Sequence, residues 1–155
     1  MTRLSIQRTA ADNPYLHKDF HGALSTGIDY LQRIYGDDAV RRYLRQFART
    51  FYAPLTRDLN VRGLAAMRAH LEAIYAVEGV EISLTGTEDE LVLAVPYCPA
   101  VRHLRAKHYP VAALFVETTR TVYAAICEDT PFTAELLEYD AETGRARVRF
   151  SRRSA

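Results

Sequence analysis

Two histidines near the amino terminus, His17 and His21, have the spacing of a paired-imidazole site. A helix advances about 100° per residue, which places His21 about 40° from His17 and on the side of the apolar Leu24 and Ile28. Imidazoles one turn apart on one helix face can bind the same divalent metal ion, because their nitrogens converge. The alternative is that each histidine is a core residue hydrogen-bonded to a carbonyl or a carboxylate.

The pair does not match the metalloprotease motif His-Glu-x-x-His. Lys18 stands where that motif has its glutamate, and Asp19 falls nearly on the opposite helix face. Metal-assisted proteolysis is therefore not expected. If the pair binds metal, we expect one divalent ion, zinc or manganese. Without metal, His17 and His21 would act as acid/base and oxyanion-stabilising groups.

Cys98 is the second candidate, because it follows a predicted strand and precedes Pro99 and a predicted helix. Amides at a helix N-terminus favour the thiolate, which attacks carbon or binds metal. Cys98 would then be the nucleophile or the third metal ligand beside His17 and His21. The alternative is a buried thiol that packs as a small hydrophobic group. That alternative is favoured for Cys127.

Other titratable groups are weaker candidates. Glu117 is the best carboxylate for a general base or a further ligand, but it falls about 160° from Phe115 on the helix. That angle predicts solvent exposure unless the helix is covered on both sides. His103 and His108 lie near Cys98 in the sequence. His103 could reach the sulfur, but we expect it to face solvent.

Basic residues form a ridge with a helical period at Arg41, Arg45 and Arg49. Such a ridge can bind an anionic substrate or a partner, but it is more often a solvated helix face. The arginines that alternate along residues 145–151 have the same interpretation.

Hydrophobic periodicity predicts the elements that position these residues. We expect an extended lead-in over residues 1–13. Gly36 is expected to end the first helix, and Pro54 the second. Asp37 or Asp38 would cap the second helix, and Asn60 the third. The expected helices are 17–35, 37–51, 60–79, 99–107 and a long one from Pro110; the expected strands are 80–85, 91–95, 132–139 and 145–151.

This order predicts an α+β fold with N-terminal helices packed on a mostly antiparallel sheet of about four strands. One long helix would lie between two hairpins. The length of 155 residues suits a single domain, 1–155.

Composition excludes several classes of function. Twenty basic residues balance nineteen acidic ones, giving a net charge of +1 and no footprint for nucleic acid. No apolar run approaches the ~20 residues that span a membrane. Residues 1–13 are polar and lack the apolar stretch of a signal peptide, so we expect none there, and two cysteines are too few for a disulfide framework. We therefore expect a soluble cytoplasmic protein; whether it forms a homo-oligomer stays open.

Several segments carry a resemblance to a known family. They are the block 15–24 (Tyr-Leu-His-Lys-Asp-Phe-His-Gly-Ala-Leu), Tyr30-Leu31, Tyr35-Gly36, Cys98-Pro99, Phe115 to Thr118, Tyr139 to Gly144, and Phe150. From residue 13 to 150 the chain resembles the L-2-amino-thiazoline-4-carboxylic acid hydrolase family. The resemblance implies a small α+β hydrolase that opens a cyclic C–N system, distantly like vinyl-reductase-type small-molecule-binding domains. Members often carry a cysteine after the glycine of the last hairpin, where this chain has Arg145-Ala146-Arg147.

Two functional hypotheses follow. The first is a small-molecule hydrolase that opens a ring or an amide-like C–N (or C–C) bond. His17 and His21 would bind a metal or move protons, Cys98 would attack or ligate, and Glu117 would be a base or a further ligand. The second is a non-enzymatic module that binds a hydrophobic or aromatic ligand, for which ten tyrosines and no tryptophan are suitable.

Overall fold

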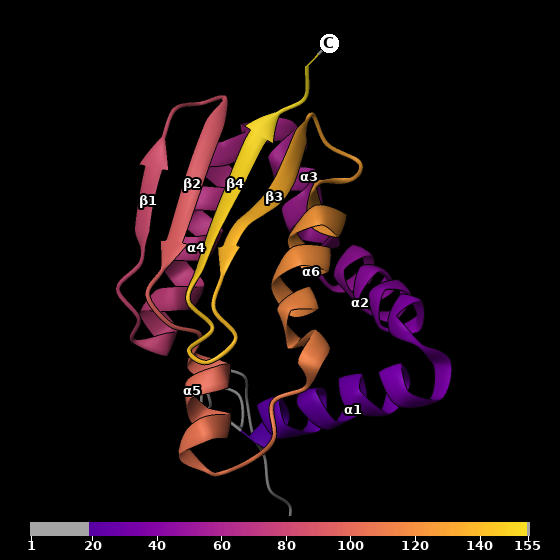
Figure 1. Cartoon of the computed structure of the whole chain (residues 1–155). Helices are drawn as coiled ribbons and strands as arrows, with labels where there is room; N and C mark the ends of the chain where they lie inside the picture. Colours follow the sequence, from indigo (N-terminus) through magenta and orange to yellow (C-terminus); the bar gives the residue numbers. More distant parts are fainter. Residues whose placement is uncertain (1–18, 155) are drawn as a thin grey trace, which may run out of the picture.

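The computed structural model describes residues 19–154, and this part of the chain starts with four consecutive helices. They are α1 (Asp19–Tyr35), α2 (Asp37–Phe51), α3 (Ala53–Arg62) and α4 (Leu64–Glu78). A hairpin of β1 (Ser83–Gly86) and β2 (Glu90–Val95) follows, then α5 (Pro99–Ala106), the 3₁₀ helix η2 (Ala113–Val116) and α6 (Glu117–Cys127). The hairpin of β3 (Phe132–Tyr139) and β4 (Ala146–Arg152) ends the fold (Figure 1).

The four strands form one antiparallel sheet in the order β1-β2-β4-β3. Its central pair is β2 and β4, in which Leu93 lies opposite Val148. Both side chains are buried, as are their neighbours two residues away, because alternate residues of a strand face the same side. The predicted α+β class, with N-terminal helices before the sheet, is confirmed.

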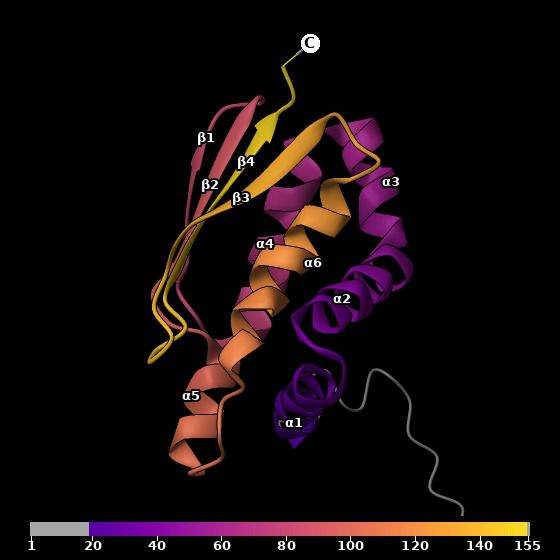
Figure 2. The same cartoon turned by 45° about the vertical axis from the view of Figure 1, so that its right-hand side comes forward.

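The helices lie on one face of the sheet in two layers. Helices α4 and α6 lie next to the strands, and α2 and α3 lie beyond them (Figures 1 and 2). Helices α1 and α5 close one end of this stack, the end at which β2 leads into α5. Residues of four helices can therefore meet at that end.

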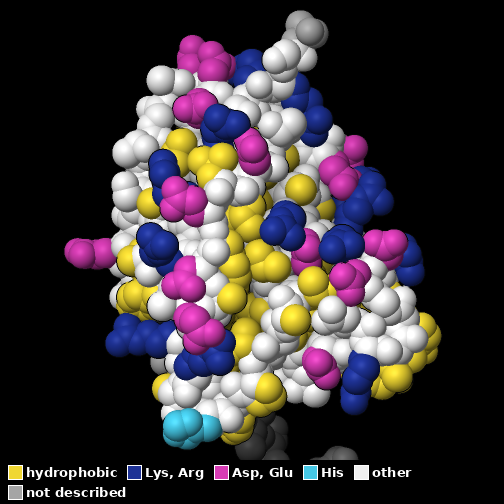
Figure 3. All heavy atoms as spheres, in the orientation of Figure 1, with side chains coloured by type: hydrophobic (Ala, Val, Ile, Leu, Met, Phe, Trp, Pro, Cys, Tyr) yellow, Lys and Arg dark blue, Asp and Glu magenta, His cyan; other side chains and the backbone are white. Residues whose placement is uncertain are grey.

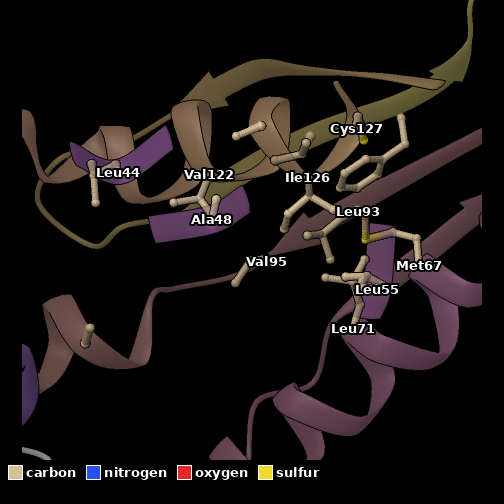
Figure 4. Packing of buried hydrophobic residues seen from close by; sticks show 14 of the residues in the cluster. Leu44, Ala48, Leu55, Met67, Leu71, Leu93, Val95, Val122, Ile126 and Cys127 are labelled. Atoms are coloured by element: carbon tan, nitrogen blue, oxygen red, sulfur yellow. The ribbon is translucent and has the colours of Figure 1, made fainter. Parts of the chain in front are cut away.

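The core lies between the helical layers and the sheet. Leu44 and Ala48 from α2, Leu71 from α4, Leu93 from β2 and Ile126 from α6 converge there (Figure 4). All five are essentially inaccessible to solvent. Burying a leucine or isoleucine side chain contributes about 1.5–3 kcal/mol each, so this contact region holds both layers on the sheet.

The opposite face of the sheet is charged. Arg147 of β4 pairs with Glu138 of β3, and Arg149 pairs with Glu135. Figure 3 shows positive and negative side chains interleaved over this face. The alternating arginines of the last strand therefore form a solvated, ion-paired surface, as predicted.

The predicted third helix, 60–79, is wrong at its start. Gly63, with φ of 62°, separates α3 from α4, and Pro54 lies in the first turn of α3 rather than ending α2. Proline suits a first turn because its missing N–H is not needed there. Asn60 is no cap: its side chain donates to the carbonyls of Thr56 and Asp129. Gly36, not Asp37 or Asp38, holds the N-cap position of α2.

The predicted long helix from Pro110 starts later. Residues 110–112 are not helical, η2 begins at Ala113, and α6 begins at Glu117. The cause is a tertiary contact: the Ala112 N–H donates to Ser25 Oγ (2.9 Å), which donates to the Pro110 carbonyl (3.1 Å). The predicted lead-in, 1–13, and the predicted start of the first helix at 17 lie outside the described residues. Within residues 19–154, no helix is long and apolar enough to cross a membrane.

Candidate functional site

A cavity of 240 Å³ lies where α1, α2, α5 and α6 meet. Five aromatic side chains line it: Phe20, Tyr43, Phe47, Tyr52 and Phe115. Leu24, Leu44, Ala100 and Val122 supply aliphatic wall, and the polar side chains are His21, Cys98 and Thr118. The cavity is mostly apolar with a few polar groups, which is the usual character of a small-molecule site.

Two of the sequence candidates, His21 and Cys98, line this one cavity from different elements. His21 lies in the first turn of α1, three residues before Leu24, so both reach the same side of the helix. Cys98 precedes α5 at its N-cap position. The structure places these two residues on one cavity, and their joint role in a functional site stays a prediction. His17 lies outside the described residues.

Cys98 is held by the turn between β3 and β4. Its N–H donates to the Thr143 carbonyl (2.9 Å), and its own carbonyl accepts from Arg102 (2.9 Å). Gly144 approaches so closely that an added Cβ would lie 2.3 Å from the Cys98 Cβ. The backbone of this cysteine is therefore fixed on both sides of its side chain.

The Cys98 thiol is not activated by its position before α5. Burial raises its pKa, and hydrogen bonds from the backbone of Val101 and Ala100 lower it without offsetting that effect. The net pKa is raised, so the thiol is protonated at neutral pH. The expectation that the helix N-terminus favours the thiolate is wrong here, because loss of water around the sulfur outweighs the two amides.

Tyrosine hydroxyls lie near Cys98, and the sequence did not indicate them. The Tyr123 hydroxyl donates a hydrogen bond to Tyr75, and both lie close enough to Cys98 to interact with it electrostatically. Burial raises the pKa of Tyr75 to about 12 and also raises that of Tyr52, which lines the cavity. These phenols stay protonated and can donate hydrogen bonds. Their helical spacing marks them only as apolar-face residues.

His103 does not face solvent, contrary to the prediction. It is half-buried on α5, and its ring lies 6.4 Å from the ring of His21, centroid to centroid, with a 59° angle between the planes. Its Nε2 is buried and has no hydrogen-bond partner among the described residues. Helix α1 packs against α5 and covers this side chain, which sequence periodicity within an eight-residue helix could not predict.

Glu117 lies outside the cavity. Its side chain is 0% exposed and accepts hydrogen bonds from Thr121 (2.7 Å), Arg120 (2.9 Å) and Arg41 (3.4 Å). Burial raises the pKa of its carboxyl, but Thr121, Arg120 and Arg41 together lower it, and the net pKa is below the ordinary value. Glu117 is an ion-paired structural residue between α6 and α2. It is buried because sheet and α2 cover both sides of α6.

The basic ridge on α2 and the second cysteine also have structural roles. Arg45 and Arg49 pair with Glu128 at the end of α6, at 2.6 and 2.7 Å. Cys127 is fully buried in the core (Figure 4), and burial raises its pKa to about 12. The interpretation of Cys127 as a packing residue agrees with the structure. The arginine ridge joins α2 to α6 rather than standing free.

Within residues 19–154, no three His, Cys, Asp or Glu side chains are grouped so as to bind a metal ion. The expected ligand set of His17, His21 and Cys98 includes one residue outside that range. The part of the set that the structure describes is the pair His21 and Cys98 on the wall of the cavity.

Comparison with known proteins does not assign this chain to a family. No family model matches the chain, and no curated protein matches it in sequence. Any function must therefore be argued from the cavity itself.

Proposed function

We propose that the cavity binds a small organic molecule with one ring system and one polar group. The observation that carries the proposal is the lining: five aromatic side chains around 240 Å³, with His21, Cys98 and Thr118 as the polar groups. Drug-sized ligands occupy roughly 300–1,000 Å³, so this cavity suits a smaller molecule. Aromatic walls favour a flat ring, since aromatic pairs contribute about 0.5–1.5 kcal/mol beyond the area they bury.

The polar groups favour a ligand that accepts hydrogen bonds at one end. The Cys98 thiol is protonated and the Tyr52 phenol is also held in its neutral form. A neutral thiol and a neutral phenol can each donate to a carbonyl, an imine nitrogen or a carboxylate. We therefore expect heterocyclic amides, imines or carboxylates to bind better than plain hydrocarbons of the same size.

A cavity-filling substitution tests the binding. Val122→Phe would occupy the site, because Val122 is 7% exposed and lines the wall. The matched control is Val61→Phe, at a position on α3 that is 83% exposed. Binding of small ring compounds, measured by ligand-observed NMR, should be lost in the first variant and kept in the second. Equal binding by both variants would place the ligand elsewhere.

A larger side chain in the cavity can unfold the protein, so a second substitution that adds no volume is needed as an independent test of binding. Tyr52→Phe removes a phenol donor from the wall at nearly constant volume. We expect it to weaken heterocyclic acceptors and leave apolar rings unchanged. Thermal unfolding of each variant shows whether the fold survives.

Hydrolysis of a ring C–N bond is the second candidate function, and the shared cavity of His21 and Cys98 favours it. The resemblance to the L-2-amino-thiazoline-4-carboxylic acid hydrolase family supports the same chemistry. Because the thiol is protonated, a base must take its proton before sulfur can attack carbon. His21 would take that proton and return it to the leaving nitrogen, and water would then release the opened product from sulfur.

Turnover separates the two functions. Cyclic amides and thiazolines would be incubated with the wild-type protein, Cys98→Ser and His21→Asn, and ring opening would be followed by mass spectrometry. The hydrolase proposal expects turnover by the wild type alone. Binding without turnover by the wild type would leave the cavity a binding site only.

A further inference from the structure

A row of exposed aromatic side chains follows the outer side of α2, in the helical layer farther from the sheet (Figure 2). Tyr43, Phe47 and Phe51 recur at four-residue steps, so they lie on one face of the helix. They are 51%, 37% and 63% exposed. The rings of Phe47 and Phe51 stack on each other with centroids 5.3 Å apart. These three residues form the α2 aromatic surface.

The α2 aromatic surface has the composition of the centre of a protein interface. An open hollow of 400 Å³ lies on it, and the described side chains that line this hollow are the three aromatic residues together with Gln46 and Thr50. None of these five side chains is charged, in a chain of which 25% of the residues are charged. The centres of protein interfaces are likewise depleted of charge and enriched in tyrosine and phenylalanine.

A second hollow, of 460 Å³, lies beside the first, and Phe51 lines both. Helix α4 contributes the small side chains of Ala66 and Ala69 to it, with His70 next to them. Burial lowers the pKa of His70, so its ring is uncharged at neutral pH. One side of the molecule therefore carries a projecting aromatic ring and, next to it, a hollow with small side chains.

We propose that a second copy of this chain binds here, with Phe51 of each copy in the hollow beside Ala69 of the other. A two-fold dimer uses the same surface on both copies, so that surface must hold both a projecting group and a place that receives it. Phe51 and the adjoining hollow meet this requirement. A different protein would need only one of the two features.

The exposed aromatic area suits the core of such a dimer. An aromatic side chain has about 150–250 Å² of surface. Phe20 of α1, which lines the ligand cavity with Tyr43 and Phe47, is 55% exposed. Together with the α2 aromatic surface it leaves roughly 400 Å² of aromatic side chain exposed. A standard interface buries about 800 Å² per partner, of which somewhat more than half is non-polar.

The dimer would also change the surroundings of the ligand cavity. Tyr43 and Phe47 line both that cavity and the hollow on α2, so the partner copy covers these two walls from outside. The inference goes beyond the proposed function and does not depend on it, because the dimer contact needs no ligand.

Sedimentation velocity of the full chain tests the proposal. The wild type should sediment as a species of twice the chain mass of 17.6 kDa. Phe51→Glu and Ala69→Lys should each weaken dimerisation at least about tenfold, the scale of losing a central contact of an interface. Both positions are exposed, and Phe51 does not line the ligand cavity, so neither charge enters the core.

The matched control is an exposed apolar residue on another layer of the fold. Leu137 of β3 is 38% exposed, and α6 lies between β3 and α2. Leu137→Glu should dimerise like the wild type. Equal loss of the dimer in Leu137→Glu and Phe51→Glu would place the contact elsewhere and overturn the proposal.

Mixing the two variants tests the exchange of Phe51 directly. In a mixed pair, the wild-type Phe51 of the Ala69→Lys chain meets the unchanged hollow of the Phe51→Glu chain. At the other contact, the new glutamate meets the new lysine. The mixture should therefore dimerise although each variant alone does not. Because only folded chains can recover pairing, recovery also excludes a folding defect, and a mixture that stays monomeric would overturn the proposal.

The wild type itself provides the last test. Interfaces of standard size have micromolar or tighter affinities, so a chain that stays monomeric at about 100 μM would overturn the proposal. Residues 1–18 of the same chain, or another protein, would then be the occupant of the surface. Val122→Phe fills the ligand cavity and should leave the dimer intact. A dimer that binds no ring compound would contradict the proposed function alone, and ring binding by a monomeric wild type would contradict this inference alone.

Discussion

Gly144 and Cys98 are in direct backbone-to-side-chain contact, although 46 positions separate them in the chain. A Cβ at Gly144 would lie 2.3 Å from the Cys98 Cβ and 3.2 Å from the Cys98 nitrogen. The turn between β3 and β4 thus fixes the residue that lines the cavity. The glycine of this turn is also in the left-handed region, with φ of 69°.

Gly144→Ala should destabilise the protein and displace Cys98. The left-handed backbone alone costs an alanine about 1–2 kcal/mol, and the clash with Cys98 adds to it. Urea unfolding should show a lower midpoint, and the rate at which a thiol reagent modifies Cys98 should change.

Gly27→Ala is the matched control, because no atom lies within 4 Å of an added Cβ in the middle of α1. There alanine should stabilise by roughly 0.5–1 kcal/mol. If Gly144→Ala were equally stabilising, the turn would not constrain Cys98.

Cys98 should react slowly with alkylating agents at neutral pH. Its raised pKa keeps the thiolate scarce, and only the thiolate is the nucleophile. The alkylation rate of Cys98, followed site by site with mass spectrometry, should rise with pH and reach half its maximum above the midpoint of the unfolded chain. A midpoint below that of the unfolded chain would show that the helix N-terminus dominates after all.

Cys127 provides an internal comparison in the same experiment. It is 0% exposed and burial raises its pKa to about 12, so it should stay unmodified until the protein unfolds. Modification of both cysteines at one rate would indicate global opening rather than the chemistry of either site.

Local patterns predicted most of the elements but not their tertiary constraints. Strand alternation and the Gly36 and Gly79 helix ends were sufficient to find the sheet and the ends of α1 and α4. Gly63 was missed because the apolar period continues across it. The late start of α6 depends on Ser25, which is 87 positions away from Ala112.

The candidate site was predicted only in part, because local patterns do not show which residues of other elements lie beside it. The four-residue spacing from His17 identified His21 as a candidate, and the position before a predicted helix identified Cys98. Both residues line the cavity. Glu117 was predicted as an exposed base because one helix face was assumed to be open. His103 and the tyrosines around Cys98 have no local pattern that points to chemistry, since their surroundings come from other helices.

Glu117→Gln should destabilise the protein by about 1–3 kcal/mol, the cost of weakening a buried, hydrogen-bonded charge. Its partners Arg41 and Arg120 are about half exposed, which keeps the effect in the lower part of that range. The folded pKa lies below the ordinary value of 4.5, so the carboxylate contributes its stability above that pH. The contribution is lost as pH falls through the folded pKa.

Urea unfolding of the wild type and Glu117→Gln at several pH values measures this. The difference between them should be largest near pH 7, and it should shrink as the pH falls below the ordinary carboxyl pKa of 4.5 and through the lower folded pKa of Glu117. Glu142→Gln is the control, because Glu142 is 81% exposed and pairs with Arg105 only at 3.5 Å. A difference independent of pH would mean that Glu117 acts by shape rather than by charge.

Ser25→Ala should loosen the wall of the cavity that α1 forms. Ser25 is 2% exposed, and its hydroxyl satisfies both the Ala112 N–H and the Pro110 carbonyl. Removing it leaves two backbone groups without a partner, at a cost of about 1–3 kcal/mol for a buried group. Hydrogen exchange at Ala112 should accelerate before the core opens, because the segment before η2 loses the hydrogen bonds that join it to Ser25 of α1. Ser154→Ala, at an exposed position, should change neither exchange nor stability; unaltered exchange at Ala112 in Ser25→Ala would show that packing alone holds α1 in place.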